Sequence, residues 1–225
     1  GAIAHYGNED QKKKYLPWIC AGEKPAICIT EKEAGSAAND MRTQARLDGD
    51  SYVVDGQKWW ITGAGTSRLY LLFARFNDTP GAVGIGGLLI EKGTPGFEIG
   101  KREPAMGLRG LPEGELIFEG CRVPRENLLI GEGGFKQLMS AYNGQRVGAA
   151  SVALGLAQGA YEEAVQFARQ RKQDGRAIAS LQGIQWMLAD MTMQIDAARL
   201  LIYRAAANAG KGLPDRHEAA LAKTF

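Results

Sequence analysis

The chain has 225 residues, 45% of them hydrophobic, which is enough for one large domain or two modest domains with buried cores. Its 27 basic and 25 acidic residues are interspersed and leave a net charge of +2, so the sequence has no electrostatic footprint for nucleic acid or an anionic membrane. No apolar stretch is long enough for a membrane span and no signal peptide is recognisable, so we expect a soluble protein inside the cell.

The first 25 residues have a helical pattern. Asn8 stands three residues before Gln11, which is the spacing of a capping box and predicts a helix that starts at residue 9. Pro17 is expected to begin a second short turn, which Gly22 closes. We assign residues 1–25 to the end of a helical domain.

Residues 26–130 change to a pattern of short strands. Strands are expected at 52–54, 59–62, 69–73, 88–90 and 116–118, with turns at Asp48-Gly49, Asp55-Gly56, Pro80-Gly81 and Pro95-Gly96. Because no helices separate them, these strands predict an antiparallel β-sandwich or barrel. Two glycine clusters lack the context of a nucleotide fingerprint. We interpret residues 84–87 as a flexible hairpin and residues 131–134 as the hinge to the next domain.

The stretch from Ala26 to Ser36 stands out within this domain. An apolar run predicts a strand, and it stops abruptly in charged, small and hydroxyl residues. Gly35 would let the backbone pass close to a ligand, and the Ser36 hydroxyl could hold a phosphate oxygen. The alternative interpretation is a strand end followed by a solvated loop.

Residues 131–225 predict an α-helical bundle. Small residues between Gly144 and Gly159, including four glycines, would let a neighbouring helix approach closely. Apolar residues then recur in steps of three and four from Leu181 to Ile202, the pattern of a bundle seam. Asp215 with Glu218 predicts the start of a third helix, inside which the sequence stops, so we expect a fragment of a longer protein.

The cysteines and histidines indicate no reactive site. Cys20, Cys28 and Cys121 are scattered, and His5 and His217 lie near opposite ends of the chain. These positions have neither metal-ligand spacing nor a Cys–His pair, and they argue against a Ser-His-Asp hydrolase. Reduced, buried thiols and no metal site are therefore expected.

Several stretches together resemble the acyl-CoA dehydrogenases, which are FAD enzymes built from a helical domain, a β-domain and a helical bundle. The stretches are residues 6–17, 29–36, 56–62, 94–96, 123–129, 146, 155–158, 169–173 and 189–191. Each is weak alone, but their order and spacing are specific. The resemblance covers nearly the whole chain.

The resemblance implies a set of binding residues. The cofactor-binding positions would be Ile27, Ile29, Thr30, Gly35, Ser36, Trp60, Ile61, Thr62, Arg171, Gln173 and Gln182. The substrate-binding positions would be Ser36 and the bundle residues that align with the family's coenzyme A segment, which are Asn143, Gly144, Gln145 and Arg146. Arg171, Gln173 and Gln182 would reach the FAD of a neighbouring subunit.

Some positions depart from the family pattern. Ile27, Lys32-Glu33, Ala37 and Gly63 replace residues that are common in relatives, and Asp174 stands where the family usually has Phe. The departure at Asp174 therefore leaves it undecided whether this hairpin contacts the FAD of a neighbouring subunit. The catalytic base is expected beyond Phe225, because Gln145 occupies the alternative base position and cannot accept a proton.

The resemblance implies FAD-dependent α,β-dehydrogenation of an acyl-CoA, with an electron-transferring flavoprotein as the electron acceptor. Two alternatives stay open: an acyl-CoA oxidase, and a non-catalytic relative that acts as a binding module. A homotetramer is implied, in the cytoplasm of a bacterium or in the mitochondrial matrix.

Overall fold

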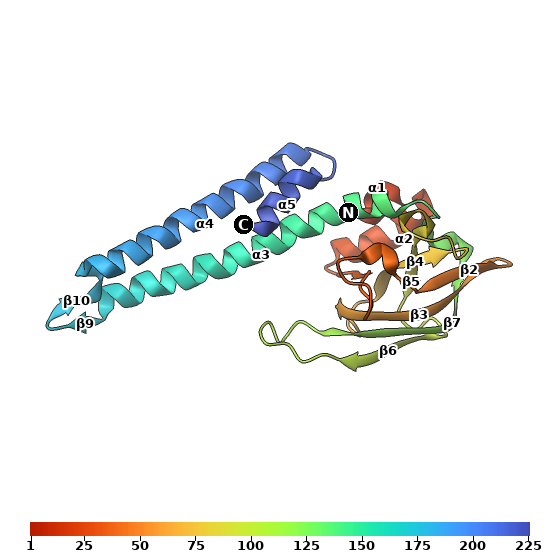
Figure 1. The fold of residues 1–225 in the computed structure, drawn as a ribbon, viewed down its shortest axis with the longest axis horizontal. Helices are drawn as coiled ribbons and strands as arrows, with labels where there is room; N and C mark the ends of the chain where they lie inside the picture. Colours follow the sequence, from red (N-terminus) through yellow and green to blue (C-terminus); the bar gives the residue numbers. More distant parts are fainter. The chain divides into compact units, whose positions relative to one another are not determined.

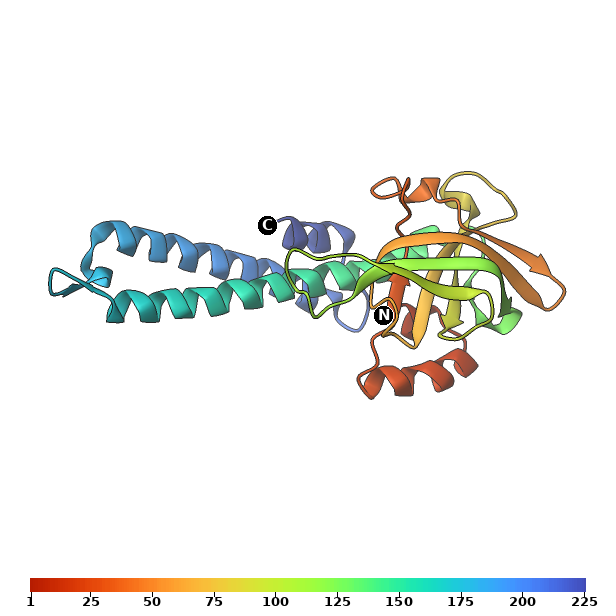
Figure 2. The ribbon, with the colours of Figure 1, turned by 90° about the horizontal axis from the view of Figure 1, so that it is seen from below.

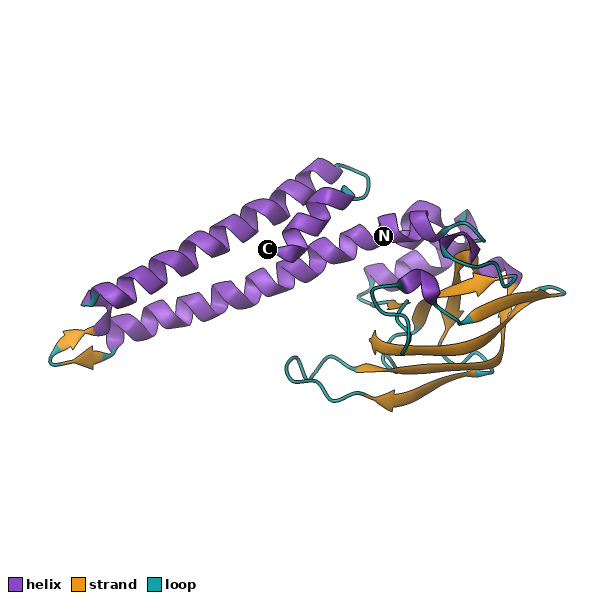
Figure 3. Cartoon of the chain, in the orientation of Figure 1, coloured by secondary structure: helices purple, strands orange, loops and turns teal.

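The computed structural model describes residues 1–225, and their contacts divide the chain into two compact units. One unit is Ala2–Met139, and the other is Ser140–Phe225 together with Gly1. Figure 3 shows the sheet within the first unit, whereas the second is helical apart from one small hairpin. The predicted order of a β-sheet domain followed by helices is confirmed.

Two helices precede the sheet, α1 (Ala2–Tyr6) and α2 (Glu9–Cys20). The capping box is confirmed, since the Gln11 amide donates to Asn8 Oδ1 at 2.8 Å and the Asn8 amide donates to Gln11 Oε1 at 3.2 Å. The expected break at Pro17 is wrong, because α2 continues through it. Pro17 lies in the last turn, where one lost amide bond is offset by the burial of Tyr15 beside Trp18.

Eight strands form the main sheet. They are β1 (Ala26–Cys28), β2 (Gln44–Asp48), β3 (Ser51–Thr62), β4 (Leu69–Phe76), β5 (Ile85–Glu91), β6 (Phe97–Arg102), β7 (Glu113–Pro124) and β8 (Leu128–Ile130). Short 3₁₀ turns lie at η1 (Ala38–Asp40), η2 (Ala82–Gly84) and η3 (Arg125–Asn127). The order is β6-β7-β3-β2-β4-β5-β8, with β1 paired to β4. Most pairs are antiparallel as expected, but β1 and β2 both run parallel to β4, so a purely antiparallel sheet is wrong.

Strand β4 lies at the centre of this unit and is buried on both faces. Tyr70 and Leu72 point into the layer between the two halves of the sheet, where Phe97 contacts the Tyr70 ring at 4.8 Å between centroids. Leu71 and Phe73 point the other way, into a cluster that α1 and α2 cover. Figures 1 and 2 show these two helices against that face of the sheet.

The pair Asp55-Gly56 is not the turn that the sequence suggested. It lies inside the single strand β3, at a register shift between Val54 and Gly56 against β7. Gly56 has φ +145°, and a Cβ there would lie 2.6 Å from Thr43 Oγ1. Glycine is thus required by a close approach within the sheet rather than by a hairpin.

Two further expectations about this unit are wrong. Residues 84–87 are no flexible hairpin, because Gly84 ends η2 and Gly86 and Gly87 are buried in β5. Strands β2 and β6 were not expected, since their residues are mostly polar and exposed. Their pairing with neighbours, not their own composition, makes them strands.

We expect Gly56→Ala to lower the free energy of unfolding by more than about 1 kcal/mol, because alanine meets both an unfavourable φ and the Thr43 side chain. Urea unfolding measures the change. Gly107→Ala is the control, since Gly107 has no positive φ and nothing within 4 Å of a built Cβ. Equal stability of the two variants would contradict the prediction.

The second unit contains most of α3 (Phe135–Gln170), followed by β9 (Lys172–Gln173), β10 (Arg176–Ala177), η4 (Ile178–Ser180), α4 (Gln182–Ala209) and α5 (Arg216–Thr224). Helix α4 returns alongside α3, and α5 folds back at its end (Figure 1). The cap of α5 is confirmed, because Asp215 Oδ1 accepts from the His217 amide at 2.8 Å and the Glu218 amide at 3.2 Å.

The predicted bundle seam is only partly buried. Of its residues Ile195 and Ile202 are buried, whereas Leu181 and Met191 are exposed. The expected close helix approach at the four α3 glycines is not observed, since nothing lies within 4 Å of a Cβ built at any of them. None of the helices combines the length and apolar character needed to cross a membrane.

Candidate functional site

The segment that follows β1 is tied to β3 by two hydrogen bonds. The Trp59 amide donates to the Thr30 carbonyl at 2.9 Å, and Lys58 Nζ donates to the Ile29 carbonyl at 2.9 Å. A reciprocal pair of amide bonds between Glu31 and Ala34, at 3.1 and 3.2 Å, then closes the turn. Ile29 and Thr30 therefore lie beside the last part of β3.

The end of β3 carries an unusual backbone. Its register against β7 shifts between Lys58 and Ile61, and Trp60 within this bulge has φ +53°. About half of the Trp60 side chain is exposed (51%), whereas Ile61 is buried in the core. A non-glycine residue in this region costs on the order of 1–3 kcal/mol and persists where the surrounding structure imposes it, often at functional sites.

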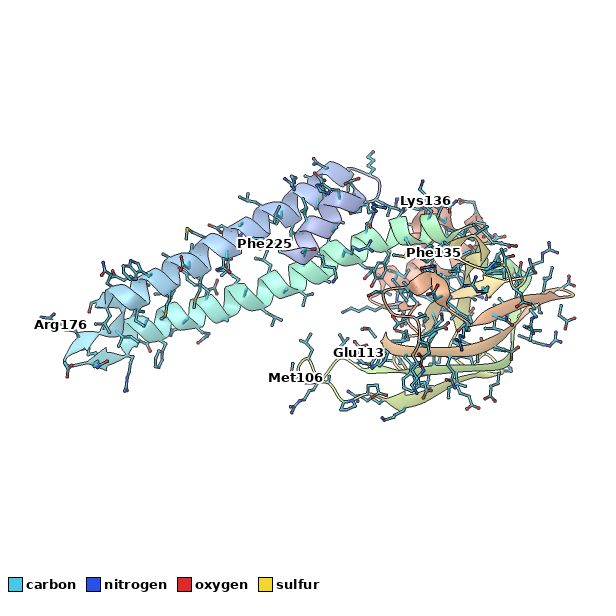
Figure 4. All side chains as sticks on the ribbon, viewed as in Figure 1. Met106, Glu113, Phe135, Lys136, Arg176 and Phe225 are labelled. Atoms are coloured by element: carbon cyan, nitrogen blue, oxygen red, sulfur yellow. The ribbon has the colours of Figure 1, made fainter.

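Thr62 is exposed at the end of the same strand. Its hydroxyl donates to Glu113 Oε1 at 2.6 Å, and Glu113 begins β7. In Figure 4 Glu113 lies at the base of the β6–β7 loop, and Met106 lies toward the tip of that loop. The half-exposed Trp60 indole and the Thr62 hydroxyl thus lie at the end of β3, where the strand is bonded to the Thr30 carbonyl.

A buried ion pair lies beneath this end of the sheet. Lys58 has no exposed side-chain surface, and its Nζ lies 2.8 Å from Glu31 Oε1. Met41 Sδ is 3.7 Å from the same nitrogen. The Glu31 carboxylate also accepts from the backbone amides of Arg42 at 2.6 Å and Thr43 at 3.0 Å, so every group of the pair has partners.

The environment shifts the protonation of both partners. Burial favours the neutral carboxyl of Glu31, but the Lys58 charge and the Arg42 amide outweigh it and hold the pKa of Glu31 below its usual value. Burial is also the largest influence on Lys58 and lowers its pKa, while Glu31 opposes that shift. The carboxylate is therefore ionised at neutral pH and stabilises the ammonium.

The other predicted positions of this unit are less tightly held. Ile27 is half-buried and packs on the apolar cluster under α1 and α2, so its side chain is engaged there. Gly35 and Ser36 are exposed after the buried Ala34, with nothing within 4 Å of a Cβ built at Gly35. This open backbone leaves room for a ligand close to Ser36.

The predicted substrate residues of α3 have a different environment. Asn143 is buried, its Nδ2 donates to the Pro214 carbonyl at 3.1 Å, and its Oδ1 accepts from Arg146 at 2.5 Å. The Arg146 guanidinium lies 5.2 Å from the Tyr142 ring centroid. Gly144 and Gln145 are exposed. Asn143 thus holds Arg146 and the α4–α5 loop, and Arg146 remains half-exposed.

Three further predicted positions gather where α3 turns into α4. Arg171 precedes the β9–β10 hairpin, Gln173 lies in β9, and Gln182 begins α4; all three are exposed. Figure 4 labels Arg176 in this hairpin. Asp174 occupies its turn at φ +47° and Gly175 follows at φ +76°. An aspartate tolerates this conformation better than a phenylalanine, which accounts locally for the departure at this position.

Sequence reasoning missed the partners of the site. Glu31 and Lys58 lie in the stretches that resemble the family, but no role was expected for either of them. No sequence pattern indicated Glu113 as a partner of Thr62. The available signal was a lysine inside a strand otherwise rich in apolar residues. Such a position implies a buried partner, because an unpaired ammonium is rarely buried.

Comparison with known sequence families gives two matches in chain order. The family described as acyl-CoA dehydrogenase, middle domain, matches residues 26–121, and acyl-CoA dehydrogenase, C-terminal domain, matches residues 132–225. The chain belongs to the acyl-CoA dehydrogenase family. The resemblance inferred from the sequence is confirmed, and the β1–β3 site lies in the middle domain of the family.

Individual acyl-CoA dehydrogenase relatives are similar over the whole chain. A 3-sulfinopropanoyl-CoA desulfinase of Cupriavidus necator is 50% identical over 100% of this chain and 58% of its own length. A short-chain specific acyl-CoA dehydrogenase of Clostridium acetobutylicum is 44% identical over 98% of this chain and 59% of its own. The chain spans less than two thirds of the length of these relatives.

A solved structure from work on the electron transferring flavoprotein of Acidaminococcus fermentans has a TM-score of 0.95 and 43% identity. The match covers 98% of this chain and 59% of that chain. The solved butyryl-CoA dehydrogenase of Megasphaera elsdenii has a TM-score of 0.94 and 40% identity over 98% of this chain and 58% of that chain, so this chain has the acyl-CoA dehydrogenase fold.

Proposed function

We propose that the protein binds FAD at the end of β1 and β3 and acts on an acyl-CoA thioester. The observation that carries the proposal is that β3 ends in the half-exposed Trp60 and the Thr62 hydroxyl, next to the point where the Thr30 carbonyl is bonded to the strand. An aromatic face, backbone donors and a hydroxyl are the groups that suit a planar heteroaromatic ring with polar edges. The residues present therefore fit a flavin.

Each residue has a role in this proposal. The amides of Ile29 and Thr30 would hold the pyrimidine edge of the flavin, and Trp60 would cover one ring face and exclude water. The Thr62 hydroxyl would give up its bond to Glu113 and donate instead to the edge that receives the hydride. The bound FAD would supply a two-electron acceptor. Gly35 and Ser36 would admit phosphate at the open end of the loop.

In the bundle, Arg146 would bind coenzyme A and Asn143 would hold Arg146 in place. Arg171, Gln173 and Gln182 would contact the FAD of a neighbouring subunit. They lie around one hairpin, where they provide a guanidinium group, which is always charged, and two side-chain amides. The reaction would be α,β-dehydrogenation, in which the α-proton passes to a carboxylate and hydride leaves the β-carbon. Gln145 is neutral, and we assign the base to none of the 225 residues.

A desulfinase is the second candidate. It is supported by four relatives of that name, which are 48–50% identical, against 44% for two relatives named as acyl-CoA dehydrogenases. Both candidates act on a coenzyme A thioester, and they differ in its acyl group.

The experiment that separates the candidates is product analysis with the purified protein. It is mixed with a series of straight-chain acyl-CoAs and with 3-sulfinopropanoyl-CoA, and flavin bleaching, enoyl-CoA, sulfite and hydrogen peroxide are measured. Bleaching with enoyl-CoA formation supports dehydrogenation, peroxide in air supports an oxidase, and sulfite release supports desulfination. A folded, flavin-loaded protein that includes the segment proposed to carry the catalytic base, and that still converts none of them, would support a binding module instead.

An electron-transferring flavoprotein is the proposed acceptor if the protein is a dehydrogenase. The support is the structural similarity to a chain from work on such a flavoprotein. The named relatives are bacterial, which supports a cytoplasmic location over the mitochondrial matrix.

We expect a homo-oligomer, and a tetramer by family resemblance. Helix α4 carries five large apolar side chains that are each more than half exposed. They are Trp186, Met187, Met193, Leu200 and Tyr203. Apolar area of this extent usually marks an interface. Light scattering at micromolar concentration should give about four times the chain mass of the protein, and a monomer would contradict the prediction.

A further inference from the structure

We propose that Lys58 and Glu31 are positioning residues that orient the peptide between Ile29 and Thr30, so that its N–H faces the flavin. The inference rests on the proposed flavin site and adds two residues to it. Neither side chain would touch the cofactor, because Lys58 is fully buried and Glu31 is nearly so.

The geometry of the peptide unit carries the first step. Lys58 Nζ is buried beneath the loop and donates to the Ile29 carbonyl at 2.9 Å. This hydrogen bond requires the carbonyl to point inward. A trans peptide is planar, so its C=O and N–H point in opposite directions. The Thr30 N–H therefore points away from the buried ammonium, and Thr30 itself is only half-buried.

The next peptide is fixed independently. The Thr30 carbonyl accepts from the Trp59 amide at 2.9 Å, and the Glu31 amide donates to the Ala34 carbonyl at 3.1 Å. Rotation of the Ile29–Thr30 peptide is then the remaining freedom at this position. The hydrogen bond from Lys58 Nζ to the Ile29 carbonyl prevents this rotation. Only a side chain with a polar hydrogen-bond donor at residue 58 can make that bond.

Glu31 holds the lysine in place. Its Oε1 is 2.8 Å from Lys58 Nζ, and both of its oxygens accept backbone amides, from Arg42 and Thr43. The carboxylate thereby links the β1 turn to the start of β2 as well as to β3. A buried ion pair adds little to stability compared with apolar residues of the same volume. The structural gain here is a single peptide orientation.

The test compares FAD affinity with stability in three variants of the whole protein. Lys58→Met removes the donor, and the double variant Glu31→Gln, Lys58→Met also removes the buried unpaired charge. Val54→Ala, in the core of β3, is the control that weakens the same sheet without contacting the loop. Urea unfolding gives stability, and titration of the apoprotein with FAD, followed by flavin fluorescence and absorption, gives the dissociation constant.

We expect the double variant to regain stability relative to Lys58→Met, yet both to bind FAD about tenfold more weakly than wild type. Val54→Ala should lose stability but stay within about threefold of the wild-type dissociation constant for FAD. The tenfold change in the Lys58 variants corresponds to the loss of one correctly directed hydrogen-bond donor. FAD binding by the double variant that matches Val54→Ala would overturn the positioning role. Wild-type protein that binds no FAD would instead reject the proposed function.

Discussion

Lys58→Met is expected to lower the free energy of unfolding by about 3–5 kcal/mol at pH 7, because it leaves the Glu31 carboxylate buried without its counter-charge. Urea unfolding measures the loss. The matched control is Arg122→Met, which removes an ion pair of 2.6 Å with Asp48 on the surface of the same sheet. Exposed pairs contribute about 0–1 kcal/mol, so the control should lose far less.

The size of this loss should depend on pH. In the wild type the Glu31 pKa lies below its ordinary 4.5, so the stabilisation is present above pH 4.5 and is lost as pH falls through the folded value. In Lys58→Met, burial dominates and raises that pKa, so the folded state takes up a proton as pH falls from 7 toward 4.5. The difference between the two proteins should therefore narrow over this range. A difference that is constant with pH would show that Glu31 does not cause it.

Trp60→Gly is expected to weaken FAD binding by about 5- to 150-fold while leaving the fold as stable as before or more stable. Stacking of an aromatic side chain on a heteroaromatic ring contributes on the order of 1–3 kcal/mol. Glycine also adopts φ +53° without strain, and the indole it replaces is half-exposed. FAD titration and urea unfolding measure the two effects.

Leu108→Gly is the control for Trp60→Gly, because Leu108 is exposed and has a similar φ of +50° in the β6–β7 loop. This control should gain stability through the same release of strain and keep its FAD affinity. Equal FAD binding by both variants would remove Trp60 from the proposed site.

The parts of the fold that depend on residues close together in the sequence could be predicted from it. The Asn8 and Asp215 caps follow from side chains that bond amides two or three positions away. Asp55-Gly56 has the sequence of a turn but lies in a strand, where glycine is required because Thr43, just before β2, packs against it. The continuation of α2 through Pro17 likewise depends on tertiary burial.

The site was predictable only in part, for the same reason. The stretches that contain Thr30, Trp60 and Thr62 were identified through family resemblance, and the structure brings Thr30 beside β3 through the Trp59 amide. The Glu31–Lys58 pair joins residues 27 positions apart, and its burial depends on the register of the whole sheet. Local pattern carries no information about such a pairing.

The central claim is that this chain holds FAD at the end of β1 and β3, and equilibrium titration tests it most directly. Flavin-depleted wild-type protein and Trp60→Gly are titrated with FAD, and the flavin absorption and fluorescence are followed. The account predicts saturation at one FAD per chain for the wild type, with a clear loss of affinity in the variant. Folded wild-type protein that leaves the flavin spectrum unchanged would contradict it.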